Sequence, residues 1–277
     1  MEDLDRRNSS VVHERNQLDD LAAIGLDWDG EVVRQSERFE RYSRAIEQLT
    51  AAGLTYPCYC SRREIAEAIS APHSGPTDGS AAGSSSADAD RRYPGTCRSL
   101  SDTERRTVEA TGRQPAIRLR GGDESVAFTD RVAGPFTGRV DDVVLRRNDG
   151  VPAYNLAVVV DDAEQGIEEV VRGDDLLSST PAQIHLGRLL GLPTPTYLHV
   201  PLVLGPTGAR LAKRDGAVTL GDRLALGETV GTLIARLATS LGLTGVGERV
   251  SAHDLLDTFD PARIARAPWT LTQDELH

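Results

Sequence analysis

Several kinds of residue and segment are scarce in this chain of 277 residues, and each scarcity excludes a class of protein. No apolar run approaches the ~20 residues that a transmembrane helix needs. The first ten residues, MEDLDRRNSS, are too charged for a secretory leader. Three cysteines cannot all pair with one another, and two of them stand in Cys-x-Cys spacing. The sequence therefore predicts a reduced, cytoplasmic protein without a membrane partner.

Lysine is the scarcest basic residue. Lys213 is the single lysine of the chain, and arginine stands at all the other positions that carry a lysine or an arginine. A lysine in a chain that otherwise uses arginine indicates a place where a compact ammonium on a flexible stem is required. A solvated turn is the alternative, because the surrounding loop is rich in glycine. The net charge of −11 argues against a protein that coats nucleic acid non-specifically, although it permits a local basic groove.

Apolar periodicity predicts alternating helices and strands. Helices are expected over 10–24, 36–52, 61–69, 181–190, 228–241, 252–258 and 261–266, and the first two carry stripes of core residues. Strands are expected over 115–120, 126–128, 142–147, 153–160, 166–172 and 199–204, with a hairpin turn at 148–150. Because strands and helices alternate in the second half, we expect a parallel α/β sheet. The length suggests about two domains.

A candidate metal site lies around a low-complexity stretch. Residues 71–90 contain no large apolar side chain and are expected to form a mobile insertion. Cys58 and Cys60 precede this insertion, and Cys97 follows it. Thiolates bind zinc well, and three of them leave one tetrahedral position, which Tyr93 or His73 could fill. The alternative is a set of small buried thiols.

Candidate binding residues follow or begin the predicted strands, where ligands bind in open parallel sheets. Arg172 ends one strand and presents a planar donor fork that suits a carboxylate. Lys213 follows another strand, in a loop whose flanking glycines allow it to deliver an ammonium to a triphosphate. Tyr154 begins a neighbouring strand, and Glu2 and Asp3 lie at the start of the chain. Taken singly, such residues are more often structural.

Seven stretches of the chain form a familiar ordered set. They are EDLD at 2–5, GLDWD at 25–29, CYC at 58–60, YPGTC at 93–97, PAYNLAVVVDD at 152–162, VVRGDDLLSSTPAQ at 170–183 and RLAKR at 210–214. With them the chain resembles the class I glutamyl-tRNA synthetase catalytic core over nearly its whole length. It is most similar to the short paralogues of that family, the glutamyl-Q tRNA(Asp) synthetases. Two features favour the paralogues: the Cys-x-Cys…Tyr-x-x-x-Cys pattern, and too few residues after the lysine loop for helical anticodon-binding domains.

The resemblance implies roles for individual residues. Lys213 matches the ATP-binding lysine of the KMSKS loop, which here reads Arg210, Leu211, Ala212, Lys213, Arg214, so that an arginine replaces the first lysine and an alanine the serine. Three residues match glutamate-binding positions, namely Glu2, Tyr154 and Arg172. Four match zinc ligands, namely Cys58, Cys60, Tyr93 and Cys97. The implied reaction joins glutamate to ATP with Mg²⁺, and then passes the glutamyl group to queuosine in the anticodon of tRNA(Asp).

The resemblance also implies a domain layout. A Rossmann-like catalytic core is expected at 1–55 and 150–205, a zinc-containing insert at 56–149, and the KMSKS-like loop with a helical region at 206–277. In the family a strand, a HIGH-like motif and a helix precede EDLD, whereas here Met1 stands directly before Glu2. We therefore expect an N-terminally truncated sheet and weak adenylation by this chain unless in-frame upstream sequence restores the unit. A monomer is expected. Two alternatives stay open: a truncated discriminating glutamyl-tRNA synthetase that charges tRNA(Glu), and an inactive zinc-bearing RNA-binding module.

Overall fold

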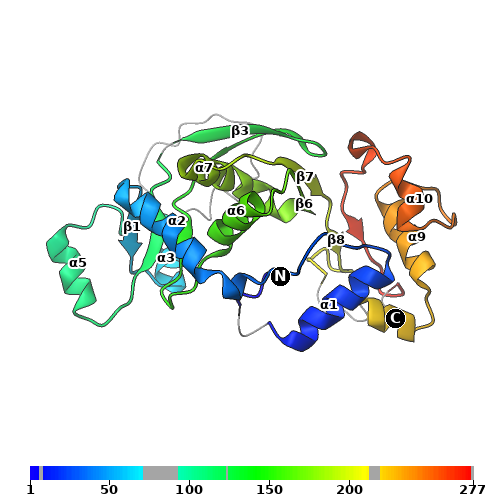
Figure 1. The fold of residues 1–277 in the computed structure, drawn as a ribbon, viewed down its shortest axis with the longest axis horizontal. Helices are drawn as coiled ribbons and strands as arrows, with labels where there is room; N and C mark the ends of the chain where they lie inside the picture. The colour runs from blue at the N-terminus through cyan, green and yellow to red at the C-terminus, as the bar shows by residue number, and fades with distance from the viewer. Residues whose placement is uncertain (6–8, 71–92, 123, 212–218, 276–277) are drawn as a thin grey trace.

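The computed structural model describes residues 1–5, 9–70, 93–122, 124–211 and 219–275 (Figure 1). The molecule is elongated in this view. The helix α5 (Asp102–Glu109) lies at one end, and α9 (Val230–Ser240) and α10 (Ala252–Leu256) lie at the other. No helix in these ranges is long and apolar enough to cross a membrane. Shorter helices are α3 (Arg62–Ser70) and α8 (Leu220–Ala225).

Three helices pack together in the centre of the molecule: α2 (Phe39–Ala51), α6 (Tyr154–Glu164) and α7 (Thr180–Leu190). The stripe predicted for 36–52 is confirmed, because Tyr42, Ile46 and Leu49 are buried in the largest apolar cluster. Leu156 and Val160 of α6 and Leu186 of α7 complete that cluster from the other side. The packing of these stripes fixes the position of α6 and α7, whose ends carry the candidate site.

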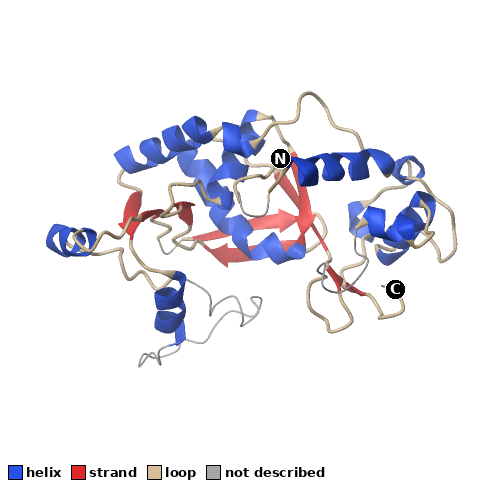
Figure 2. Ribbon diagram, turned by 90° about the horizontal axis from the view of Figure 1, so that it is seen from below, coloured by secondary structure: helices blue, strands red, loops and turns tan. Residues whose placement is uncertain are grey.

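The strands form several small sheets, which Figure 2 shows among the helices. An antiparallel sheet joins β1 (Thr55–Cys58), β2 (Ala116–Leu119) and β5 (Val144–Arg146), and β3 (Ser125–Asp130) pairs with β4 (Gly134–Arg139) as a hairpin. Parallel pairing joins β6 (Glu169–Gly173) to β7 (Thr196–Val200), and β8 (Val203–Leu204) to β9 (Trp269–Thr270). The predicted parallel sheet is thus confirmed in the described ranges only as two pairs of strands within a mixed α/β fold.

The helix α1 (Val11–Ala23) confirms one prediction and corrects another. Its start is as predicted, since the Ser10 hydroxyl accepts the His13 N–H at 3.1 Å as an N-cap. Its apolar stripe is not core, however, because α1 has no buried residue and Val11 is 82% exposed. A helical period shows which side chains share a face, but not whether another element covers that face.

The prediction of a strand over 153–160 is wrong. Pro152 makes an isolated antiparallel bridge to Arg146, which confirms the turn at 148–150, but the chain then enters α6. Leu156, Ala157, Val158 and Val160 are all buried there. A short, continuous apolar run is expected of a strand buried on both faces, and it is equally expected of a helix enclosed by other helices. Tyr154 consequently begins a helix and not a strand.

The helix α7 follows the prediction closely. Pro181 lies in its first turn, and Gly191 ends it with a left-handed φ of 72°, which glycine adopts without steric cost. The strand predicted over 199–204 divides into β7 and β8. The strand predicted over 166–172 is β6, and it is half open to solvent, with Val171 59% exposed.

Candidate active site and metal centre

Glu2, Tyr154 and Arg172 come together although they are far apart in the sequence. Burial raises the pKa of Glu2, and the charge of Arg172 counteracts part of that increase. Burial also raises the pKa of Tyr154, with a contribution from the negative charge of Glu2 and an opposing one from Arg172. The side chains therefore lie near enough to interact electrostatically, with Tyr154 at the N-terminus of α6 and Arg172 near the end of β6 half-buried and Glu2 more exposed.

Asp162 joins this group and was not among the residues singled out from the sequence. Burial, followed by the charge of Asp161, raises the pKa of Asp162 to about 6, while Arg172 acts in the opposite direction. Its carboxyl is therefore neutral in part of the molecules near neutral pH. Asp162 stands in the PAYNLAVVVDD stretch, but only the helical course of α6 turns it toward Arg172.

Arg172 is held by side chains on two neighbouring elements, β7 and α7. Its Nε donates to His199 Nε2 at 3.0 Å, and its Nη2 donates to Thr180 Oγ1 at 2.8 Å. Its Cζ lies 5.4 Å from the centroid of the Tyr197 ring. Asp130 lies behind His199. Sequence reasoning missed Thr180, His199 and Asp130, because the packing of β3 and α7 against β6 and β7 leaves no periodic signal.

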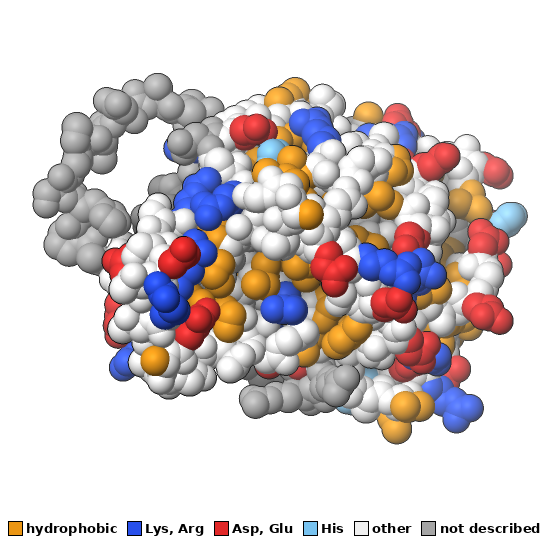
Figure 3. All heavy atoms as spheres, turned by 60° about the vertical axis from the view of Figure 1, so that its left-hand side comes forward, with side chains coloured by type: hydrophobic (Ala, Val, Ile, Leu, Met, Phe, Trp, Pro, Cys, Tyr) orange, Lys and Arg blue, Asp and Glu red, His pale blue; other side chains and the backbone are white. Residues whose placement is uncertain are grey.

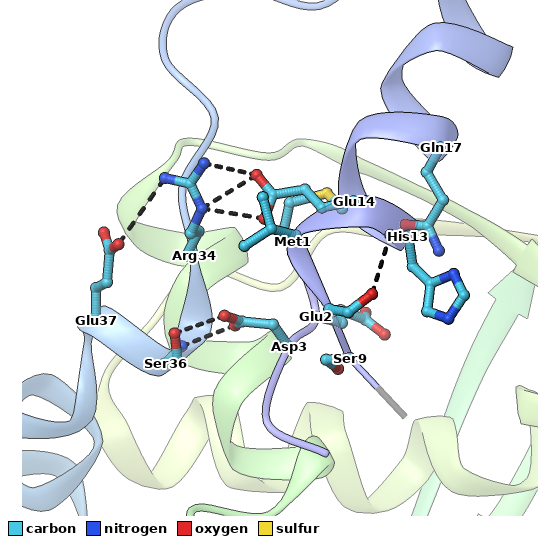
Figure 4. Close-up of a pocket in the computed structure, with 12 residues that line it drawn as sticks. Met1, Glu2, Asp3, Ser9, His13, Glu14, Gln17, Arg34, Ser36 and Glu37 are labelled. Carbon is cyan, nitrogen blue, oxygen red and sulfur yellow. Dashed lines mark hydrogen bonds and ion pairs between the residues drawn. The ribbon is translucent and has the colours of Figure 1, made fainter. Parts of the chain in front are cut away.

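Asp3 anchors the segment that carries Glu2. Its carboxylate accepts the Ser36 backbone N–H at 2.8 Å and the Ser36 hydroxyl at 2.5 Å, and Figure 4 shows both contacts. Nearby, Arg34 reaches Glu14 of α1 at 2.6 Å. These residues line a polar hollow of about 580 Å³ between the first residues, α1 and the segment that precedes α2. Asp3 is therefore a structural residue that fixes the position of its neighbour Glu2.

The predicted metal ligands also converge, in a buried cluster around the end of β1. The Cys60 and Cys97 Sγ atoms lie 3.4 Å apart, and the Tyr93 hydroxyl lies 3.3 Å from Cys58 Sγ and 3.5 Å from Cys60 Sγ. The three Sγ atoms all lie within 4.8 Å of one another, so that a single ion could contact all of them. His73, the alternative fourth ligand, lies outside the described residues.

Hydrogen bonds from the backbone reach two members of this cluster, although burial raises the pKa of Cys60 to about 12. The Tyr59 N–H donates to Cys97 Sγ at 3.4 Å, and the Cys97 N–H donates to the Tyr93 oxygen at 2.9 Å. Burial raises the pKa of the Cys97 thiol, but the hydrogen bonds outweigh burial and leave that pKa below its usual value. Three thiols at these separations match the sulfur donors that zinc binds well, and the Tyr93 oxygen lies close enough to be the fourth ligand.

The lysine loop is described only at its start. Arg210 forms an isolated bridge with Leu204 and pairs with Asp175 at 2.7 Å. The Leu211 N–H donates to the Val203 carbonyl at 3.3 Å, which extends the turn after β8. Ala212, Lys213 and Arg214 lie outside the described residues. The Arg210 contact brings the start of the loop to the residues that follow β6.

Basic side chains are distributed among acidic ones on the face that includes the α5 end (Figure 3). Arg98 pairs with Asp142 at 3.5 Å, and Arg113 pairs with Glu64 at 2.9 Å. This interspersed pattern agrees with the net charge of −11. Any nucleic acid would therefore meet local groups of arginines on this face and not a continuous basic surface.

The fold and these two sites define a class I aminoacyl-tRNA synthetase catalytic unit. The chain belongs to the family of class I tRNA synthetases (E and Q), catalytic domain, which matches residues 1–277. It is 54% identical over 276 residues to the glutamyl-Q tRNA(Asp) synthetase of Nocardia farcinica, covering 100% of this chain and 82% of that protein. It is 47% identical to the glutamyl-Q tRNA(Asp) synthetase of Symbiobacterium thermophilum, covering 97% of this chain and 83% of that protein. The predicted resemblance is confirmed.

A solved structure agrees with the fold. The glutamate tRNA ligase of Elizabethkingia meningosepticum, in complex with its amino acid, matches with a TM-score of 0.75 at 23% identity. The match covers 100% of this chain and 60% of that protein. The chain thus has the mixed α/β catalytic fold of class I synthetases, on a length well short of that ligase.

Proposed function

We propose that this protein activates glutamate with ATP and transfers it to queuosine in the anticodon of tRNA(Asp). The observation that carries the proposal is the 54% identity to the Nocardia farcinica glutamyl-Q tRNA(Asp) synthetase over the whole chain. The grouping of Glu2, Tyr154 and Arg172 supports it, because it supplies opposite charges in one place. Such a place suits a small zwitterion that carries an additional carboxylate.

The glutamate site is formed by groups of complementary charge. Arg172 binds a carboxylate of glutamate through its planar fork, and the phenol of Tyr154 adds a hydrogen bond. Glu2 faces the ammonium, and Asp162 provides a second acidic group beside it. Because these groups are partly buried, each contact with the substrate is stronger than it would be in bulk water.

The ATP site comprises Arg210, Leu211, Ala212, Lys213 and Arg214. Lys213 approaches the phosphates of ATP, which binds with Mg²⁺, and stabilises the charge that develops on the leaving pyrophosphate. This role follows from the family motif and from the unique lysine. The contact between Arg210 and Asp175 supports it, because it brings the start of the loop to the end of the strand that carries Arg172.

Zinc is the metal that suits Cys58, Cys60, Tyr93 and Cys97. A bound zinc ion would join the end of β1 to the YPGTC stretch and stabilise the fold of the insert. In the proposed domain layout this insert spans 56–149, the Rossmann-like core spans 1–55 and 150–205, and the loop with the helical region spans 206–277. The protein acts as a monomer.

Two other functions are separated from this one by experiment. A discriminating glutamyl-tRNA synthetase would charge tRNA(Glu), and an RNA-binding module would not activate glutamate. The family places a HIGH-like unit before EDLD, so the assays use the protein together with any coding sequence in frame upstream of Met1. The first assay is ATP–pyrophosphate exchange, which is expected to require glutamate and to give no signal with glutamine. Exchange without glutamate dependence would refute the proposal.

The Lys213→Arg substitution tests the assignment of the ATP site. It keeps the positive charge but replaces a compact ammonium by a larger planar group. We expect the rate of glutamate-dependent exchange to fall at least about tenfold, which corresponds to ~1.4 kcal/mol of transition-state stabilisation. The control is Arg210→Lys, the reverse substitution in the same loop, which is expected to change the exchange rate far less. An unchanged rate for Lys213→Arg would contradict the role given to the lysine.

A further inference from the structure

Asp130 and His199 form a fully buried pair behind Arg172. Asp130 ends β3 and His199 lies in β7, and both side chains have an exposed fraction of 0%. The Asp130 Oδ2 atom lies 2.6 Å from His199 Nδ1. The other oxygen, Oδ1, accepts the N–H groups of Val132 at 2.9 Å, Ala133 at 2.7 Å and His199 at 3.2 Å.

These contacts fix the protonation of the pair. Burial raises the pKa of Asp130, but the hydrogen bonds from His199 and from the backbone outweigh burial and leave the pKa below its usual value. The carboxylate is therefore ionised and accepts hydrogen bonds only. It follows that His199 Nδ1 carries a proton and donates it to Asp130.

The other ring nitrogen must then act as an acceptor. Arg172 has only donors, and its Nε lies 3.0 Å from His199 Nε2, so Nε2 is unprotonated. The imidazole is neutral, and burial lowers the pKa of His199 in support of this state. The charged groups that face the ring are Asp130, Arg172 and Asp174. Asp130 and Arg172 thus require the same tautomer, and the Thr180 hydroxyl, 3.3 Å from Nε2, is compatible with it.

Thr180 completes the support of the guanidinium. Its Oγ1 accepts from Arg172 Nη2 at 2.8 Å and lies 3.2 Å from the Leu176 carbonyl, to which it donates. The internal contacts therefore occupy Nε and one hydrogen of Nη2. Arg172 also interacts with the phenol of Tyr154, and the N–H groups that these contacts leave free are held in a fixed direction. Without these contacts, an arginine on a strand that is half open to solvent would lose side-chain conformational entropy when it binds a ligand.

We propose that Asp130 and His199 are positioning residues, which hold the guanidinium of Arg172 in the orientation that receives the carboxylate of glutamate. This inference deepens the proposed function and rests on the role that it gives to Arg172. Neither residue contacts the substrate. Their effect is to preorganise the site, so that binding glutamate need not also order the side chain that recognises it.

Two substitutions of His199 separate its two hydrogen bonds. In His199→Asn the amide nitrogen takes the place of Nδ1 and keeps the contact with Asp130, but the side chain is too short to reach Arg172. In His199→Gln the amide reaches the place of Nε2 and can accept from Arg172. We expect the Kd of glutamate, measured by calorimetry, to rise at least about tenfold for His199→Asn, equivalent to ~1.4 kcal/mol, and far less for His199→Gln. The Kd of ATP is expected to stay within about twofold in both variants.

Glutamate affinity equal to wild type in His199→Asn would overturn the inference and leave the proposed function intact. Equal weakening of glutamate and ATP would also overturn it, because that result indicates general loss of structure. If the wild-type protein does not bind glutamate at all, the proposed function fails. Nitrogen-15 NMR of the His199 ring then decides the inference: a protonated Nδ1 and an unprotonated Nε2 agree with it, and the opposite tautomer refutes the arrangement.

Discussion

Asp162 is the ionisable residue whose environment has the plainest consequence for stability. Its pKa is raised to about 6 in the folded protein, chiefly by burial and next by the charge of Asp161. The folded state therefore keeps a proton that the unfolded chain releases from about pH 4 upward. The free energy of unfolding therefore decreases as the pH rises from about 4 to about 6. Above about pH 6 the carboxylate is charged in the folded protein, and the full cost of burying that charge is present.

The Asp162→Asn substitution removes this cost. We expect the variant to have a higher Tm than wild type at pH 7.5, and the difference to shrink as the pH is lowered toward 4. Thermal unfolding at a series of pH values measures it. Asp19→Asn, which changes an exposed carboxylate on α1, is the control and is expected to show no such trend. A Tm difference for Asp162→Asn that does not vary with pH would contradict the assignment.

At the residue scale, the sequence predicts residues that belong to one motif better than residues that come together only in the folded structure. Cys58, Cys60 and Cys97 were expected together because their spacing matches a metal site, and the structure brings them together. Glu2, Tyr154 and Arg172 were expected through the family resemblance. Asp130 and His199 were not predicted, because they meet only when β3 and β7 pack side by side.

At the scale of elements, β4 and the start of α7 approach each other at Gly138. A Cβ at this position would lie 2.7 Å from Pro181 Cγ and 3.2 Å from Phe136 Cε1. Gly138→Ala therefore forces the hairpin away from the helix, and we expect it to lower the free energy of unfolding by about 1–3 kcal/mol in urea titrations. Because Pro181 is rigid, little relief is available from side-chain rotation.

Gly187 provides the matched control for Gly138. It lies within α7, where an added Cβ would meet Val159 Cγ1 at an ordinary 3.7 Å. Alanine has the higher helix propensity, so Gly187→Ala is expected to raise the free energy of unfolding by up to about 1 kcal/mol. Equal stabilities of Gly138→Ala and wild type would show that the hairpin and helix can separate without cost.

The cysteine cluster brings the end of β1 and the YPGTC stretch together, and we expect it to bind zinc. In Cys97→Ser we expect zinc, measured by mass spectrometry of the purified protein, to fall far below the amount of about one ion per chain that the wild type would hold. Protease sensitivity around residues 58 and 97 is expected to increase, because the ion no longer joins the two segments. Ser99→Ala, which alters an exposed neighbour, is the control. Equal zinc contents in Cys97→Ser and wild type would exclude Cys97 as a ligand.

Element prediction succeeded where a segment carries its own boundary signals. Pro181 and Gly191 mark the two ends of α7, and Ser10 caps the start of α1. It failed for α6, since a short apolar run in a fully packed environment has no period to distinguish helix from strand. The helices α5 and α8 were not predicted, although both have a capping box, because they lack a buried apolar face.

At the scale of the whole molecule, the chain combines a catalytic α/β centre with a cysteine-bearing end and a helical end. The order of motifs predicted the family, and the match over residues 1–277 confirms it. The strand pairing was less predictable: alternation of strands and helices in the second half indicated a parallel sheet, whereas the parallel strands there form two separate pairs, β6 with β7 and β8 with β9. Sequence alternation does not specify which strands become neighbours.

The transfer of labelled glutamate to purified tRNA tests the central claim most directly. The assay offers the protein, with any coding sequence in frame upstream of Met1, three acceptors: tRNA(Asp) with queuosine, tRNA(Asp) without it, and tRNA(Glu). We predict that the label enters only the queuosine-containing tRNA(Asp) and survives removal of its 3′ end. Label on tRNA(Glu), or no label on any acceptor despite glutamate-dependent pyrophosphate exchange, would contradict the account.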